Sequence, residues 1–446
     1  MPTQTRIRRR TTDYGVTMVA PLTLDSIDIH STDLLASRGY PWADWDLLRA
    51  EAPVHWYERP DIEPFWAVTR YSDIHFVGSN DKLFINGGAR LRLASTQDDI
   101  EMWERYRIRN ERFGWDVDEV PDLVYMDKPR HTQFRNLAAR SFTPKAMRQL
   151  ESHLAQYATR FAAEFTQRLE AHGEADLVED LAVKLPLATI CDLMGLPADD
   201  WSRVHEYFGF SFSSREVMMR AALPGESYNE LRLRKSAELY NYCQAIGDRG
   251  RTDNGGDLVS RVSTGEVDGC PLTDQQLNGY TLLLLAAGNE TTRNATTGGV
   301  IALLEHPEQL QLLCSNPSLV DTTAEEILRW TSPVIQFART ATDDVELGGQ
   351  LIRKGDTVGV YYPSANRDER AFEDPYRFDV TRSPNYHQAF GHGAHFCLGA
   401  NLARWELRAA LRALLPVLPR LELVGGPTRF GHLHLGAIQH QTVRLR

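Results

Sequence analysis

One long stretch near the middle of the chain limits the fold more than any other feature. No proline interrupts the sequence from Thr273 to Glu305, and Thr273 followed by Gln276 is a pattern that caps a helix at its start. A helix of this length would span roughly 50 Å, enough to cross a domain. The segment from Leu282 to Ala287 is apolar on every face, which indicates that the helix runs through the core. The sequence therefore predicts a mainly helical protein built around this element.

The same predicted helix carries residues that suit a buried helix poorly. Gly288, Glu290, Thr291 and Thr292 follow the apolar segment, although glycine, an acid and β-branched threonines are unfavourable there. Local rules broken in a core usually mark function. A threonine hydroxyl beside a buried carboxylate can relay protons through water. A threonine that is only bonded to its own preceding turn is the alternative.

A second candidate site lies near the C-terminus, where a cysteine follows two glycines. Gly391 and Gly393 precede Cys397, and an amphipathic run from Leu398 to Leu415 follows it. Loop amides and a helix N-terminus would then converge on the sulfur, a setting that lowers the pKa of a thiol and favours a metal-binding thiolate. A buried structural cysteine is the alternative for Cys397 taken alone. The two glycines do not form a dinucleotide-binding motif, because Phe396 stands where that motif needs a third glycine.

This loop resembles the haem-thiolate loop of the cytochrome P-450 monooxygenases, Phe-x-x-Gly-x-[Arg/His]-x-Cys-x-Gly. The matching residues are Phe390, Gly393, His395, Cys397 and Gly399. The resemblance implies that the protein holds haem b (iron protoporphyrin IX) between the long helix and the loop. Cys397 would be the metal ligand, and its electron donation favours oxygen activation. It also implies the family's fold, a large helical domain with a small β-rich region.

The unusual residues of the long helix resemble the same family's oxygen-activation motif, [Ala/Gly]-Gly-x-[Asp/Glu]-Thr. Ala287, Gly288, Glu290 and Thr291 stand at its positions. The resemblance implies that Thr291 and Glu290 are catalytic, because splitting dioxygen requires two protons. Gly288 would lie against the cofactor.

Two basic residues open another predicted helix. His131 and Arg135 lie four apart on one face, a spacing able to grip carboxylates, although an ordinary surface pair is the alternative. The resemblance implies that both bind haem propionates, together with Arg339 and His395.

Glu326 and Arg329 form an acid–base pair that any helix can carry. Placed between the two main motifs, they resemble the family's Glu-x-x-Arg pair, with Arg377 as the third member. Such a cluster would be a buried network that stabilises the fold and does no chemistry.

The resemblance also implies where substrate lies. Val334, Ile335 and Phe337 would face the pocket, and Leu433 and Leu435 would form a second wall. The irregular pattern between residues 81 and 124 would lie over this pocket, and residues 208–226 would form a lid. Elsewhere, residues 54–57 and 65–69 are rich in β-formers on either side of a turn and predict a hairpin.

Composition excludes several classes of protein. A net charge of −11 argues against nucleic acid or an anionic membrane as the main partner. Five cysteines with no Cys-x-x-Cys pair argue against a zinc ribbon or disulfide scaffold and fit the cytoplasm. We expect residues 1–20 to form a disordered basic tail without a membrane anchor, and residues 21–446 to form one catalytic domain.

The resemblance implies a reaction that inserts one atom of O2 into a C–H bond of an apolar small molecule, with a sterol, branched lipid or terpenoid favoured. The resemblance also implies that electrons come from NAD(P)H through a ferredoxin reductase and a ferredoxin. Arg130, Arg140, Arg404 and Arg408 would form a basic dock for that ferredoxin. A peroxide-driven enzyme, a rearrangement or coupling enzyme, and a haem sensor or binding protein are the alternatives.

Overall fold

The molecule is mainly helical, as predicted, and a computed structural model describes residues 22–88, 90–211, 215–253 and 255–446. The predicted tail of residues 1–20 lies outside the described residues. The helices are α1 (Thr32–Arg38), α2 (Trp42–Glu51), α3 (Tyr71–Ser79), α4 (Thr96–Phe113), α5 (Arg130–Ala139), α6 (Pro144–His172), α7 (Lys184–Leu193), α8 (Trp201–Ser211), α9 (Arg215–Met219), α10 (Tyr228–Thr252), α11 (Leu258–Ser263), α12 (Asp274–Glu305), α13 (Pro307–Ser315), α14 (Val320–Thr331), α15 (Tyr362–Ala365) and α16 (Ala400–Leu414).

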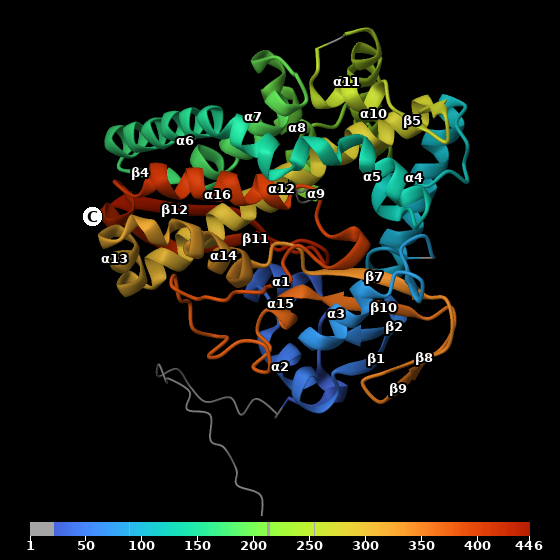
Figure 1. The fold of residues 1–446 in the computed structure, drawn as a ribbon, viewed down its shortest axis with the longest axis horizontal. Coiled ribbons are helices and arrows are strands. Elements are labelled where there is room, and N and C mark those ends of the chain that lie inside the picture. Colours follow the sequence, from blue (N-terminus) through green and yellow to red (C-terminus); the bar gives the residue numbers. More distant parts are fainter. Residues whose placement is uncertain (1–21, 89, 212–214, 254) are drawn as a thin grey trace, which may run out of the picture.

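The strands form two small sheets and two short hairpins. Their bounds are β1 (Val54–Arg59), β2 (Ile62–Val68), β3 (Phe84–Ile85), β4 (Glu174–Asp176), β5 (Glu266–Val267), β6 (Cys270–Pro271), β7 (Gln336–Ala341), β8 (Val345–Leu347), β9 (Gln350–Ile352), β10 (Thr357–Tyr361), β11 (Leu421–Phe430) and β12 (Ala437–Leu445). The larger sheet has the order β1-β2-β10-β7-β3, and β11-β12-β4 form the second. The antiparallel pairing of β1 with β2 confirms the predicted hairpin. Figure 1 shows the larger sheet beside α1, α2 and α3, apart from the long helices.

The predicted central helix is α12. The Thr273 hydroxyl accepts the N–H of Gln276 at 3.2 Å, and the Gln276 side chain accepts the N–H of Thr273 at 3.1 Å. This reciprocal cap satisfies two backbone donors that the first turn leaves free. The helix packs against α7, α10, α14 and α16, so most of its residues are buried on every side.

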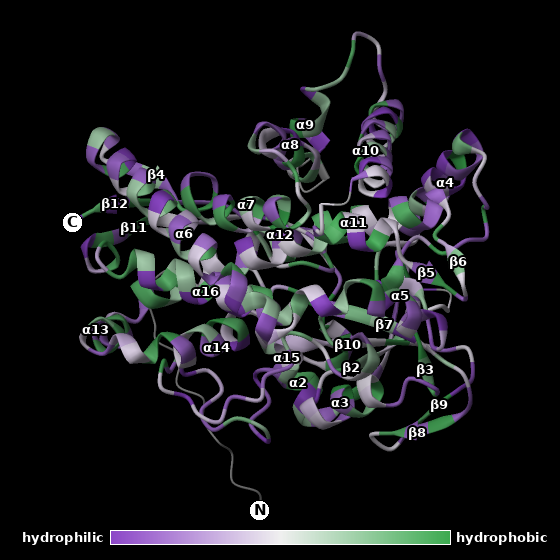
Figure 2. Cartoon of the chain, turned by 45° about the horizontal axis from the view of Figure 1, so that its top comes forward, coloured by the Kyte–Doolittle hydropathy of each residue, from purple (hydrophilic) through white to green (hydrophobic). Residues whose placement is uncertain are grey.

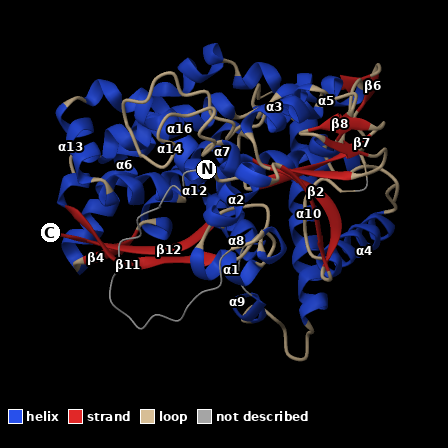
Figure 3. Ribbon diagram, turned by 90° about the horizontal axis from the view of Figure 1, so that it is seen from below, coloured by secondary structure: helices blue, strands red, loops and turns tan. Residues whose placement is uncertain are grey.

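The second sheet closes the other end of the molecule. Strands β11 and β12 pair along most of their length, and Figure 3 shows this ribbon lying well apart from the larger sheet. Strand β12 also contacts α12, so the C-terminal ribbon is fixed against the central helix.

The sequence pattern predicted that the segment between residues 81 and 124 is irregular. The prediction is wrong for part of this segment. It contains α4, a helix that Figure 2 shows as largely hydrophilic. The Ser95 hydroxyl caps its start, Gly114 ends it in a left-handed conformation, and Arg105 pairs with Glu101 one turn away. Caps and ion pairs stabilise this helix in place of an apolar stripe, so a search for hydrophobic periodicity misses it.

Among the helices that the structure describes, none combines the length and the apolar character needed to cross a membrane.

Candidate haem-thiolate site

Cys397 follows a tight loop that glycines make possible. Gly391 and Gly393 have φ values of 68° and 75°, a left-handed conformation that other residues resist. A Cβ at Gly393 would lie 1.8 Å from the carbonyl oxygen of Gly78, so only glycine fits there. The N–H of Cys397 donates to the Phe390 carbonyl at 3.0 Å and closes the loop. The helix α16 starts three residues further on, as the amphipathic run predicted.

The thiol of Cys397 is exposed even though protein encloses the loop. Burial raises the pKa of this thiol, while the Gly399 amide, Arg135 and Arg404 act in the opposite direction. The prediction that loop amides lower the pKa is therefore wrong on balance, because removal from water outweighs them. A metal ion held by Cys397 would supply the missing stabilisation, since a thiol that coordinates a metal is deprotonated outright.

Four basic side chains gather beside this loop. The rings of His131 and His395 lie 4.0 Å apart, and Arg135 donates to the carbonyl of Phe396 at 2.7 Å. Burial and the neighbouring Arg135 lower the pKa of His131 to about 4. Burial, with His131, Arg339 and Arg135 nearby, lowers the pKa of His395 to about 2. The fold thus brings together four donors from α5, β7 and the cysteine loop.

These donors suit a dianionic cofactor. His131 is buried, and its Nδ1 atom has no hydrogen-bond partner among the described residues. Arg339 is also buried, and its guanidinium donates to the carbonyl of its neighbour Ala338 at 2.8 Å. The buried Arg339 cation has no carboxylate partner among the described residues, which carries a desolvation cost that a propionate group would offset. The residues therefore fit haem b, with Cys397 placed to hold its iron.

The helix α12 presents two of the motif residues to open space. Ala287 is exposed and Thr291 half-buried, although the helix is otherwise largely buried. The Thr291 hydroxyl donates to the carbonyl of Ala287 at 3.0 Å. This is the bond to the preceding turn that the sequence left open as an alternative. It does not remove the hydroxyl from reaction, because a threonine oxygen keeps its acceptor capacity.

Glu290, unlike the half-buried Thr291, lies in the protein interior. Its carboxylate is buried and forms an ion pair with Arg293, Nη2 to Oε2, at 2.5 Å. Burial raises the pKa of Glu290, and Arg293 opposes that shift. Among the described residues no hydrogen bond joins Glu290 to Thr291, so a proton passing between them needs water.

Gly288 and Asn289, on the same turn of α12, differ in how the surrounding protein accommodates them. A Cβ at Gly288 would meet only Ile190, at an ordinary contact distance of 3.5 Å, so packing within the protein does not require glycine there. Asn289 is fully buried, and neither polar atom of its side chain has a partner among the described residues. Sequence reasoning missed Asn289, because an amide in a helix carries no distinctive pattern.

The predicted acid–base pair on α14 is buried as expected. Glu326 and Arg329 are both fully buried and bond through two pairs of atoms at 2.7 and 2.8 Å. Arg329 also donates to three backbone carbonyls, those of Asn366, Pro375 and Arg377. One guanidinium therefore fixes the long connection between β10 and the cysteine loop to α14.

The prediction that Arg377 completes this cluster is wrong. Its side chain is 61% exposed and lies 3.9 Å from Asp379, whereas Arg382 lies 3.2 Å from the Glu326 carboxylate and is 11% exposed. The motif spacing pointed to Arg377, but the chain turns after Phe378 and brings Arg382 toward Glu326. Only the path of the connection distinguishes the two.

The five predicted pocket residues lie in three different surroundings. Phe337 and Arg339 point to the same face of β7, and Val334 packs with the residues of that face. Ile335 and Leu435 instead line a different cavity, and Leu433 packs on the neighbouring core. The prediction that Ile335 faces the pocket with Val334 and Phe337, and that Leu435 forms its second wall, is therefore not met, because these two side chains line the other cavity.

The proposed basic dock is also largely neutralised. Arg404 binds Glu325 at 2.8 Å, Arg408 lies 3.1 Å from Asp321, and Arg130 lies 2.7 Å from Glu119. Arg140, by contrast, is exposed. Paired arginines attract an acidic partner less strongly than free ones, so a dock built on these residues is weaker than the sequence predicted.

Glu406 on α16 is a buried acid that sequence reasoning missed. It is 2% exposed and hydrogen-bonds with the hydroxyls of Thr189 and Thr292, which belong to α7 and α12. Burial raises its pKa to about 8, and both hydroxyls oppose that shift. The acid therefore joins three helices in its neutral form at pH 7.

We expect Glu406 to make stability depend on pH. The folded state keeps a proton that the unfolded chain releases from about pH 4.5, so this contribution is complete below that value and is lost as pH rises through about 8. Glu406→Gln should keep the neutral hydrogen bonds and flatten the decline. The test is the thermal unfolding midpoint between pH 5 and 9, and an unchanged slope in the variant would contradict the assignment.

Taken together, an open cysteine on a glycine loop, beside four basic donors and a core helix, defines the haem-thiolate class of proteins. The cytochrome P-450 family profile matches residues 248–417. The chain is 35% identical to the methyl-branched lipid omega-hydroxylase of Mycobacterium tuberculosis, over 92% of this chain and 91% of the relative. It is also 35% identical to the steroid C26-monooxygenase of Mycolicibacterium smegmatis, over 89% and 88%.

Solved structures agree with this assignment. A cytochrome P-450 of Mycobacterium marinum in complex with pseudoionone matches with a TM-score of 0.82 and 33% identity, over 96% of this chain and 100% of that one. A protein of the same family from Novosphingobium aromaticivorans matches with a TM-score of 0.81 and 29% identity, over 94% and 97%. The chain belongs to the cytochrome P-450 family, and it is therefore a haem b monooxygenase.

Proposed function

We propose that this enzyme hydroxylates a C–H bond of a branched lipid or a steroid, with terpenoids as the next class. The observation that carries the proposal is the open Cys397 thiol, set among donors for two propionates, in a chain 35% identical to hydroxylases named for such substrates. The bound haem supplies the oxygen-activating chemistry. Phe337 and Val334, on the Arg339 side of β7, would contact the apolar substrate.

The roles of the individual residues follow from their environments. Cys397 would hold the iron, and His131, Arg135, Arg339 and His395 would fix the propionates. Thr291 would hold the last proton donor in place at the open face of α12, and Glu290 would supply protons through water. We place residues 21–446 in one catalytic domain.

Electrons must reach the haem from other proteins. We infer a ferredoxin and its NAD(P)H-dependent reductase as partners, acting in the cytoplasm. Five free cysteines support a reducing compartment.

The deciding experiment is a substrate screen on the purified, haem-loaded enzyme. Branched fatty acids, steroids and terpenoids are added in turn, and a low-spin to high-spin shift selects those that enter the site. Reconstitution with ferredoxin, reductase and NADPH should then add one oxygen atom to the selected compound. Turnover with hydrogen peroxide alone, a product without added oxygen, or no reductant consumption would each favour one of the rival activities.

Thr291→Ala tests the proton relay. We expect NADPH consumption to continue while hydroxylated product falls about 10- to 100-fold and peroxide accumulates, because protons no longer arrive in order. Thr292→Ser is a matched control on the same turn. Product per NADPH and peroxide release are measured together; unchanged coupling in Thr291→Ala would reject the relay.

A further inference from the structure

A cavity of about 320 Å³ lies against the C-terminal half of α12. Its lining comes from α1 and the turn after it, from α12, from the end of α14, and from β11 and β12. It includes no residue of the cysteine loop and none of the four propionate donors. Its volume lies within the range of ligand pockets, which begins at about 300 Å³.

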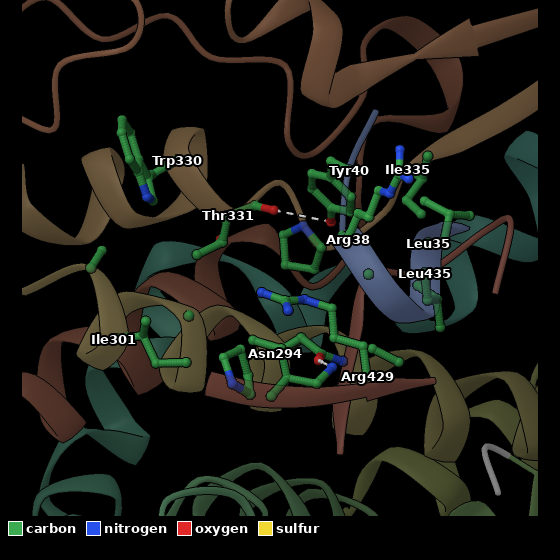
Figure 4. A pocket seen from close by; sticks show the side chains of 18 of the residues that line it. Leu35, Arg38, Tyr40, Asn294, Ile301, Trp330, Thr331, Ile335, Arg429 and Leu435 are labelled. Carbon is green, nitrogen blue, oxygen red and sulfur yellow. Dashed lines mark hydrogen bonds between the residues drawn. The ribbon is translucent and has the colours of Figure 1, made fainter. Parts of the chain in front are cut away.

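Most of the lining is apolar or aromatic. Leu35 on α1, Ile301 on α12 and the loop residues Ile335 and Leu435 contribute aliphatic surface, as Figure 4 shows. Arg367 and Trp330 also line the cavity. The Arg367 guanidinium lies 4.2 Å from the centre of the Trp330 ring and donates to backbone carbonyls. This arginine has protein partners, so it builds the wall and is not free to bind a ligand.

Arg429 differs from Arg367. It reaches into the cavity from β11 (Figure 4), it is half-buried, and it has no ion pair within 4 Å among the described residues. Burial lowers its pKa, and Tyr40 and Glu305 only partly oppose that shift. Its Nε would lie 3.3 Å from a Cβ at Gly39, so the close backbone there confines the side chain. A partly desolvated cation without a partner is costly, and an anion beside it would repay that cost.

The cavity is also connected to the catalytic helix. Asn294 lines it, donates to the carbonyl of Glu290 at 2.7 Å, and accepts the N–H of Ile438 on β12 at 2.8 Å. The same side chain thus joins the cavity wall to the turn that carries the acid of the oxygen-activation motif.

We propose that this cavity is a second ligand site, separate from the haem, that binds an apolar molecule bearing one carboxylate. The tail would lie on the aliphatic surface and the carboxylate on the Arg429 guanidinium. Arg38, which is exposed at the same cavity, adds positive charge, while the exposed Glu305 adds one negative charge. The ligand class is a short or medium-chain fatty acid, since one charge and a flexible tail match one arginine in a small apolar cavity.

The test separates this cavity from the haem site. The haem-loaded enzyme is first saturated with 4-phenylimidazole, which coordinates iron and fills the space above it. Decanoate is then titrated by calorimetry, with decan-1-ol as the uncharged probe of equal length. We expect one decanoate per chain, and a loss of at least about tenfold in decanoate affinity in Arg429→Gln, with decanol unaffected.

Arg444→Gln is the matched control, because Arg444 lies on β12 of the same sheet and pairs with Glu422 at the surface. It should bind decanoate as the parent does. The 4-phenylimidazole spectrum of each variant shows that the haem site is intact. No decanoate binding to the blocked enzyme, or equal affinity in the parent and Arg429→Gln, would overturn the proposal.

Discussion

Cys397→Ser should abolish monooxygenation, with a loss of at least about 1,000-fold in product formation. The physical reason is electron donation: a thiolate is a strong donor to iron and promotes oxygen activation, whereas a serine hydroxyl stays protonated and donates weakly. The reduced, carbon monoxide-treated variant should also lose the red-shifted absorption of thiolate-ligated haem. Both readouts are needed, because loss of activity alone could follow from loss of haem.

Cys314→Ser is the matched control, since Cys314 is a free, half-buried cysteine on α13, away from the loop. It should keep both the absorption and the activity. Haem content is measured for each variant by extraction. If Cys397→Ser kept the red-shifted absorption, another residue would hold the iron and the assignment of Cys397 as its ligand would be wrong.

Arg329→Ala should destabilise the fold strongly. The side chain is fully buried, binds both oxygens of Glu326 and donates to three carbonyls of the connection to the cysteine loop. Removing it leaves the buried Glu326 carboxylate with Arg382 as its remaining cation. Breaking a buried ion pair in this way costs about 3 to 5 kcal/mol. Denaturant unfolding of the haem-loaded protein measures this cost.

Two neighbouring arginines make the test specific. Arg382→Ala removes the second cation on Glu326 and should cost about 1 to 3 kcal/mol. Arg377→Ala removes an exposed side chain and should stay within about 0.5 kcal/mol of the parent. A larger effect for Arg377→Ala than for Arg382→Ala would restore the assignment that the sequence spacing suggested.

Local patterns were sufficient for much of the architecture. The Thr273 cap, the proline-free stretch and the apolar segment determined α12, because capping and periodicity act within one turn or a few. The hairpin at β1 and β2 was predicted for the same reason. The helix α4 was missed because side-chain ion pairs stabilise it in place of an apolar face.

The features of the candidate site also separate into those that the sequence indicated and those that the tertiary structure decided. The sequence by itself indicated the glycine loop around Cys397 by its motif, and the resemblance that this motif carries pointed to the four basic residues. Only the tertiary structure decided that Arg382 pairs with Glu326, that Glu290 turns to Arg293, and that Ile335 and Leu435 line a second cavity. Each of these depends on which segments the chain brings together across long separations, and no local pattern encodes that. The pKa of Cys397 belongs with them, since burial depends on everything packed around the loop.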